Sequence, residues 1–201
     1  MQTELRAWTV KDSIELYNIH GWGRDFFTVN EAGHVEVTPA GATSPGIDLK
    51  ELVDDLRNRG LNLPLLIRFS DILRTRVQQL CGSFQQAIAD NDYKGTYRGV
   101  YPIKVNQQRH VVEELLEYGR PYNLGIEAGS KPELLVALAL QDNPEALILC
   151  NGYRDRAYVE TALLAQKLGR RVIIIMDRLA ELATILSASR DLDIRPVIGV
   201  R

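Results

Sequence analysis

Five polar or charged residues recur at a nearly fixed interval in the second half of this 201-residue chain. Each follows a short run rich in Val, Ile, Leu or Tyr, which is typical of a buried strand. A lysine amine can form a Schiff base with an aldehyde, and a nearby carboxylate can orient it and take part in proton transfer. The five are Lys104, Glu127, Asn151, Asp177 and Arg201, separated by 23, 24, 26 and 24 residues.

The elements that carry this row alternate between strand and helix. Strands are predicted at 97–103, 122–126, 146–150, 171–176 and 195–200, and helices at 107–118, 131–140, 155–168 and 178–189. This alternation indicates an α/β fold of parallel βαβ units. It fits about five strands from the start of a (β/α)8 TIM-like barrel, whose active site lies at the carboxyl ends of the strands. An open doubly wound sheet places its chemistry at the same ends and remains an alternative.

Residues that favour helix ends mark several of these boundaries. Asn106 can cap the first helix, and Gly119 can end it. Ser130-Lys-Pro-Glu133 is a capping-box pattern with a proline in the first turn of the helix at 131–140. Gly169 can end the helix at 155–168.

Alternation along the strands predicts which side chains share a face. If Lys104 points into the barrel, Pro102 does so too, while Ile103 faces the helices. Neighbouring strands lie about 4.8 Å apart, so Lys104 and Glu127 could meet at the barrel mouth. The alternative is a plain salt bridge, or two solvated side chains at loop entrances.

Before residue 71 the chain has a different character. A helix is predicted at 8–19, a glycine-broken loop at 20–24, a hairpin from strands 26–29 and 34–38, and a linker at 39–46. A helix capped by Asp48 and ended by Gly60, a buried strand at 63–69 and a helix at 70–88 follow. We therefore divide the chain into residues 1–70 and residues 71–201, the second being the start of the barrel.

Composition excludes several classes of function. The formal net charge of -2 favours neither a nucleic acid nor a membrane partner, and no apolar run approaches the roughly 20 residues that span a bilayer. The amino terminus lacks a secretory pattern, and Cys81 and Cys150 are interpreted as reduced core thiols, which favours a cytoplasmic protein. The chain ends on a strand, and we interpret it as an amino-terminal fragment; an intact domain with an exposed edge strand is the alternative.

Three segments resemble successive motifs of the biosynthetic arginine decarboxylase family. That family belongs to the fold type III pyridoxal-phosphate-dependent decarboxylases, which have alanine-racemase-like barrels. The segments are Tyr101-Pro-Ile-Lys-Val-Asn-Gln107, Leu124-Gly-Ile-Glu-Ala-Gly-Ser-Lys-Pro-Glu-Leu134 and Leu149-Cys-Asn-Gly-Tyr-Arg-Asp155. Segments near residues 8, 27 and 63 are similar as well, so the resemblance covers nearly the whole chain.

The resemblance implies roles for five residues. Lys104 is expected to be the Schiff-base lysine, with Asn106 in the same motif and Glu127 as the catalytic acidic residue near it. Ser130 is expected to cap the neighbouring helix. Asn106, Ser130 and Arg201 are expected to bind the cofactor together with Lys104, Arg201 through the cofactor hydroxyl. Residues 1–70 are expected to associate with a β-domain formed mostly by later sequence.

The implied activity is decarboxylation of L-arginine to agmatine and carbon dioxide, a step toward polyamines such as putrescine and spermidine. The resemblance also implies a magnesium requirement and a homo-oligomer, a dimer or tetramer, in the full-length protein. Ornithine, lysine or diaminopimelate are alternative substrates, and a non-catalytic relative that binds a partner is an alternative of another class. We expect the isolated 201 residues to be inactive.

Overall fold

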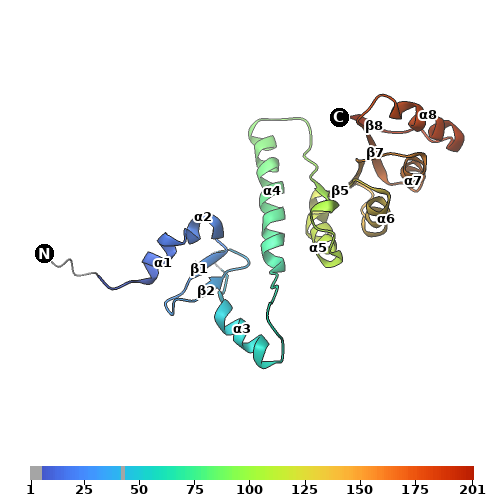
Figure 1. Ribbon diagram of the computed structural model, residues 1–201. Coiled ribbons are helices and arrows are strands. Elements are labelled where there is room, and N and C mark those ends of the chain that lie inside the picture. Colours follow the sequence, from blue (N-terminus) through green and yellow to red (C-terminus); the bar gives the residue numbers. More distant parts are fainter. Residues whose placement is uncertain (1–5, 42–43) are drawn as a thin grey trace. The chain divides into compact units, whose positions relative to one another are not determined.

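The computed structural model describes residues 6–41 and 44–201, and its chain divides into two compact units, residues 1–76 and 77–201. The first unit contains α1 (Val10–Leu16), α2 (Ile19–Gly23), β1 (Phe27–Val29), β2 (Val35–Val37), β3 (Ile47–Asp48) and α3 (Leu49–Asn58). Helix α4 (Ser70–Asp90) runs across the boundary (Figure 1). No helix among the described residues is both long and apolar enough to cross a membrane.

The predicted hairpin is confirmed, and it gains a third strand. Strands β1 and β2 pair antiparallel around a turn closed by the His34 N–H, which donates to Asn30 Oδ1. Strand β3 pairs antiparallel with β2. The sequence does not predict this strand, because two residues are too few to show an alternating pattern. Its last residue, Asp48, caps α3 by accepting from the backbone N–H groups of Lys50 and Glu51, as the sequence predicts.

Asp48 also connects the sheet to the helix. Its Oδ2 accepts from Asn30 Nδ2 at 2.7 Å and lies 2.8 Å from His34 Nδ1. Partial burial raises the pKa of Asp48, but hydrogen bonds from Glu51 N, His34 and Asn30 outweigh it and lower the pKa to about 2. At the other end of α3, Gly60 has φ +90° and terminates the helix as predicted.

Three predictions in the first unit are wrong. The helix expected at 8–19 ends at Leu16, because Asn18 has φ 48°. Most of the loop expected at 20–24 is helical, because it lies in α2. Residues 63–69 form no strand, and Leu63 and Leu66 are 61% and 76% exposed. A strand needs a neighbouring strand to pair with, and none in the described chain pairs with residues 63–69, so apolar composition alone does not make them a strand.

The second unit is built on a five-stranded parallel sheet in the order β4-β5-β6-β7-β8. Consecutive strands are neighbours throughout, without the reversal of strand order that defines an open doubly wound sheet, so the barrel alternative is the correct one. The strands are β4 (Val100–Pro102), β5 (Gly125–Ala128), β6 (Leu147–Cys150), β7 (Arg171–Met176) and β8 (Ile198–Val200).

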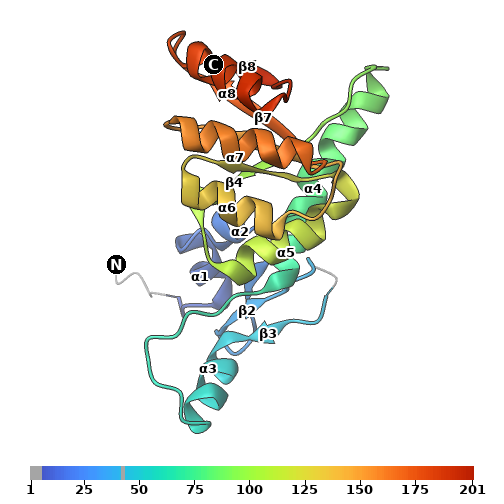
Figure 2. The same ribbon diagram turned by 90° about the vertical axis from the view of Figure 1, so that its right-hand side faces the viewer.

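Helices α6, α7 and α8 lie side by side over one face of this sheet (Figures 1 and 2). The connecting elements are the 3-10 turn η1 (Ile103–Val105), α5 (Arg109–Gly119), the 3-10 turn η2 (Arg120–Tyr122), α6 (Lys131–Leu140), α7 (Arg156–Lys167) and α8 (Glu181–Leu192). All four predicted helices are present, and α6 has the predicted bounds.

The main core lies between the sheet and these helices. Every second strand residue faces it, as the predicted alternation requires: Ile126, Ile148 and Ile174 are fully buried and pack against helix residues such as Leu163 and Ile185. The intervening residues, such as Leu149 and Ile173, are only half-buried. The sheet therefore has one covered face and one face that remains partly open to solvent.

Adjacent residues of β6 provide a test of this division. Replacing Ile148 by Ala should lower the free energy of unfolding by about 2–5 kcal/mol, because it leaves a cavity in the closed core. The matched change Leu149→Ala should cost clearly less in the 201-residue chain, because that side chain is half-buried. Urea unfolding of both variants is the measurement. An equal or larger loss for Leu149→Ala would contradict the assignment of the two faces.

Candidate active site

Lys104 lies just beyond the carboxyl end of β4, in the single turn η1. The strand was predicted to reach Ile103, but it ends at Pro102 and the chain turns so that Ile103 enters the core. The Lys104 side chain is exposed, and within residues 6–41 and 44–201 no ion pair or hydrogen bond holds its amine. A lysine amine free of a counter-ion at a strand end is available to react with a ligand.

Glu127 is a member of strand β5 and does not follow it as predicted. The strand starts late because η2 and Asn123, with φ 53°, occupy the positions expected to open it. Glu127 pairs in register with Pro102 of β4 and Leu149 of β6. It lies opposite the helix-covered face and is half-buried, and no side-chain hydrogen bond to it exists in the described part of the chain.

The register brings Lys104 and Glu127 to the same edge of the sheet without joining them. Lys104 stands two residues after Pro102, which is the strand partner of Glu127. The simple salt bridge considered as an alternative is not formed between these two residues. An amine and a carboxylate thus lie at the same edge on neighbouring strands, both without a partner among the described residues.

Ser130 caps α6 as predicted. Its Oγ accepts from Glu133 N at 3.4 Å, and the Glu133 carboxylate accepts from Gly129 N at 2.6 Å. In a capping box the Glu133 side chain would accept from the Ser130 N–H, but here it accepts from the N–H of Gly129, one residue earlier. These contacts fix the loop that follows Glu127.

Asn106 and Arg201 differ in how firmly they are held. Asn106 does not cap α5, whose cap is Gln108; its Oδ1 instead accepts from Gln108 N at 3.0 Å and closes a local turn. Tyr101 Oη also donates to the Asn106 carbonyl.

Arg201 follows β8, is exposed, and donates its backbone N–H to the Met176 carbonyl at 2.9 Å. It belongs to the same carboxyl edge, three strands away from Glu127.

The loop between β6 and α7 packs against the loop that follows Glu127. Gly152 has φ +82°, and a Cβ there would lie 1.9 Å from the Gly129 carbonyl oxygen. Tyr158 Oη donates to the carbonyls of Ala128 and Asn151, at 2.9 and 3.2 Å. Burial beside Cys150 raises the pKa of Tyr158, and burial raises the pKa of the Cys150 thiol to about 11, so both stay protonated.

A buried ion pair connects the same loop to Glu181, the first residue of α8. Arg154 and Glu181 are 1% and 7% exposed in their side chains, and Arg154 Nη2 lies 2.8 Å from Glu181 Oε2. The same oxygen accepts from the backbone N–H groups of Asp177 and Arg178, at 3.0 and 3.3 Å. Burial raises the pKa of Glu181, but the hydrogen bonds from Arg154, Asp177 and Arg178 outweigh it and lower the pKa to about 2.

Sequence reasoning missed this pair. Arg154 lies in one of the quoted motifs and Glu181 in the first turn of α8, but a separation of 27 residues carries no periodic signal. The only hint was an arginine and a glutamate next to predicted strand ends.

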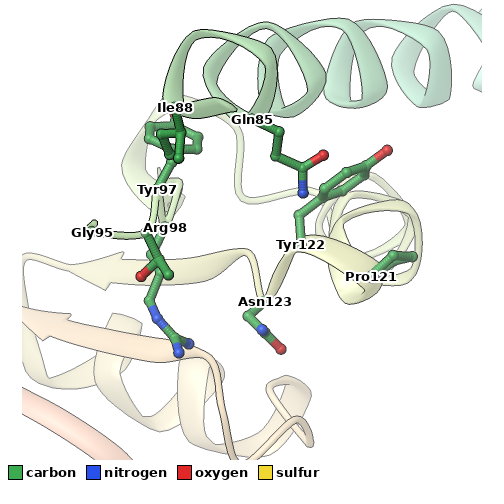
Figure 3. Close-up of a pocket in the computed structure, with 9 residues that line it drawn as sticks. Gln85, Ile88, Gly95, Tyr97, Arg98, Pro121, Tyr122 and Asn123 are labelled. Carbon is green, nitrogen blue, oxygen red and sulfur yellow. The ribbon is translucent and has the colours of Figure 1, made fainter. Parts of the chain in front are cut away.

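A pocket of about 270 Å3 lies at the opposite edge of the sheet (Figure 3). Its walls include Tyr97 and Arg98, which precede β4, and Tyr122 and Asn123, which precede β5. It is therefore at the amino ends of the strands, away from Lys104.

Sequentially ordered parallel strands with helices over one face define the class: the amino-terminal part of a TIM-like barrel, a fold whose chemistry lies at the carboxyl ends of the strands. Residues 74–199 match the family model described as pyridoxal-dependent decarboxylase, pyridoxal binding domain. The chain therefore belongs to the pyridoxal-dependent decarboxylases.

Individual relatives point to one branch of this family. The chain is 56% identical over 197 residues to the biosynthetic arginine decarboxylase of Gloeobacter violaceus, covering 98% of this chain and 31% of that protein. It is 53% identical over 196 residues to the protein of the same name from a Nostoc species, covering 98% and 29%. The crystal structure of the Campylobacter jejuni biosynthetic arginine decarboxylase superposes with a TM-score of 0.81 at 32% identity, covering 92% and 30%. The chain thus spans about a third of the length of these relatives.

The residues at the carboxyl edge fit pyridoxal phosphate, the cofactor that the family implies. Lys104 offers an amine without a counter-ion, and Glu127 offers a carboxylate that no described side chain occupies. No group of three or more His, Cys, Asp or Glu side chains that could hold a metal ion occurs among the described residues, and the magnesium requirement stays a prediction.

Two glycines with the same backbone conformation test the contact between the loops. Gly152→Ala and Gly169→Ala both place a Cβ on a residue with positive φ, but only Gly152 faces a neighbouring carbonyl, and nothing lies within 4 Å of a Cβ at Gly169. We expect Gly152→Ala to lower the free energy of unfolding by about 1–3 kcal/mol more than Gly169→Ala. Equal losses in urea unfolding would contradict the close contact.

Acid should weaken the Glu181 network. Because the folded pKa of Glu181 is below its ordinary value of 4.5, its contribution to stability is present above pH 4.5 and is lost as the pH falls toward about 2. The difference in unfolding free energy between wild type and Glu181→Gln should therefore shrink between pH 6 and pH 3. A difference that stays constant over this range would show that the carboxylate is not stabilised as described.

Proposed function

We propose that the full-length protein decarboxylates L-arginine to agmatine and carbon dioxide, with pyridoxal phosphate held on Lys104. The proposal rests on the placement of Lys104 at the carboxyl edge, where no described residue provides a counter-ion, in a chain 56% identical to a protein named biosynthetic arginine decarboxylase. The name of that relative supports arginine as the substrate over ornithine, lysine or diaminopimelate.

Each residue of the site has a proposed task. Lys104 holds the cofactor through its amine, and Glu127, on the neighbouring strand, orients that amine and exchanges protons with it. Asn106 and Ser130 keep the two flanking loops in place through the turn and the helix cap that they form. Arg201 would donate from its guanidinium to the cofactor hydroxyl.

When bound, pyridoxal phosphate supplies an electron sink for the charge that develops as the carboxylate leaves. The half-buried Glu127 carboxylate suits proton exchange near Lys104, since a partly desolvated group interacts more strongly with a neighbouring charge. The half-open face of the sheet, lined by residues such as Leu149 and Ile173, would become the barrel interior in the full-length protein and exclude water from the site.

The proposal includes the wider setting of the enzyme. Residues 1–70 would associate with a β-domain and residues 71–201 would begin the barrel. The complete enzyme would be a cytoplasmic homo-oligomer that contributes to polyamine synthesis. No step is assigned to magnesium.

Reductive labelling tests the site. Treating the full-length protein with pyridoxal phosphate and borohydride should fix the cofactor to one peptide, the one that contains Lys104, because its amine has no competing ion pair. Lys131 is the matched control, since it lies at the same edge but pairs with Asp155 at 2.6 Å. Label on Lys131 or another lysine in place of Lys104, found by peptide mapping, would refute the assignment.

A substrate panel tests the reaction. Carbon dioxide release from arginine should exceed that from ornithine, lysine and diaminopimelate, and Lys104→Ala should lose at least about a thousandfold in turnover, because its amine is the covalent attachment point. Equal or faster turnover of any rival amino acid would overturn arginine as the substrate.

A further inference from the structure

We infer that Arg154 and Glu181 form a positioning pair that holds the loops after β6 and β7 in the arrangement that binds the cofactor. This inference rests on the proposed function, because it assigns the pair to the same edge of the sheet. Neither residue is given a role in touching substrate or cofactor.

Burial of these two charges is unfavourable by itself. Both side chains are removed from solvent, and taking two charges out of water carries a large desolvation cost, which their mutual attraction must offset. Apolar side chains of similar volume are often at least as stabilising in such a position. Stability alone therefore does not account for a buried arginine and glutamate here.

The Glu181 carboxylate also binds the backbone at the end of β7, in addition to its ion pair with Arg154. Glu181 Oε2 accepts from Asp177 N and Arg178 N, the first two residues after β7. Its other oxygen, Oε1, lies within 3.4 Å of the Arg178 guanidinium. Glu181 thereby fixes the backbone direction in which the chain leaves β7 and places Asp177 at the carboxyl edge.

The loop that contains Arg154 also contacts the loop that follows Glu127. Arg154 belongs to the loop whose Gly152 fits against Gly129, and Asp155 of the same loop pairs with Lys131, the first residue of α6. Ordered contacts thus extend from the end of β7, through the loop after β6, to the loop after β5. A loop held on both sides limits the positions that the residues at this edge can adopt.

The consequence is a coupling between loop order and cofactor binding. If the ordered loops favour binding of pyridoxal phosphate, bound pyridoxal phosphate must favour the ordered loops by the same free energy. The amides of Asp177 and Arg178, which donate to Glu181, report this order directly.

The test replaces the pair by apolar side chains in the full-length protein. Single replacements leave one charge buried without its partner and lower stability, whereas Arg154→Met with Glu181→Leu removes both charges and fills the volume. Arg171→Met is the control: it breaks an exposed ion pair with Glu145, 2.7 Å long, at the amino end of β7. The readouts are the affinity for pyridoxal phosphate by titration and hydrogen exchange at Asp177 and Arg178 in the protein without cofactor.

We expect the double variant to fold, to bind pyridoxal phosphate about tenfold more weakly and to exchange both amides faster, while Arg171→Met matches wild type. Arg154→Met with Glu181→Gln should recover part of the affinity, because the amide oxygen still accepts from the two N–H groups. A folded double variant with wild-type affinity would overturn the inference and reduce the pair to a stabilising contact.

Wild-type protein provides a second test that does not depend on the variants folding. Adding pyridoxal phosphate should slow exchange at Asp177 and Arg178, and unchanged exchange in protein that binds the cofactor would also overturn the inference. Wild-type protein that binds no pyridoxal phosphate would overturn the proposed function itself, which separates the two failures.

Discussion

In the described part of the chain, helices cover one face of the parallel sheet of the second unit, and this determines where the residues at the strand ends must lie. Side chains alternate along each strand, so a residue such as Ile126 must enter the core while its neighbour Glu127 must point away from it. Parallel pairing then brings all five strand ends to one edge. Lys104 and Glu127 come to this edge because Ile103 and Ile126, the residues before them, are held in the core and β4 pairs in register with β5.

Hydrogen bonds to the loops after the strands fix the positions of the residues at that edge. Main-chain carbonyls and N–H groups at strand ends need partners, and helix side chains provide several of them: Glu133 accepts from the Gly129 N–H, Tyr158 donates to the carbonyls of Ala128 and Asn151, and Glu181 accepts from the N–H groups after β7. These contacts order the loops at the edge where Lys104 and Glu127 lie. Lys104 and Glu127 are left without partners among the described residues, which is what a ligand-binding pair requires.

Periodic features could be predicted from the sequence, and features that depend on single contacts could not. The alternation of strands with helices, the bounds of α6, the caps at Asp48 and Ser130 and the end at Gly60 follow from local rules. The absent strand at 63–69, the two-residue β3 and the late start of β5 depend on whether a neighbouring strand or turn is present. The Arg154–Glu181 pair joins residues 27 apart in sequence, which no local pattern predicts.

The central claim is that Lys104 is the cofactor lysine at the edge where the row of strand ends meets. A crystal structure of the full-length protein with pyridoxal phosphate tests it most directly. We expect continuous density from Lys104 Nζ to the cofactor, with Glu127 on the adjacent strand beside it. Cofactor density attached to another lysine, or lying at the amino ends of the strands, would refute this assignment.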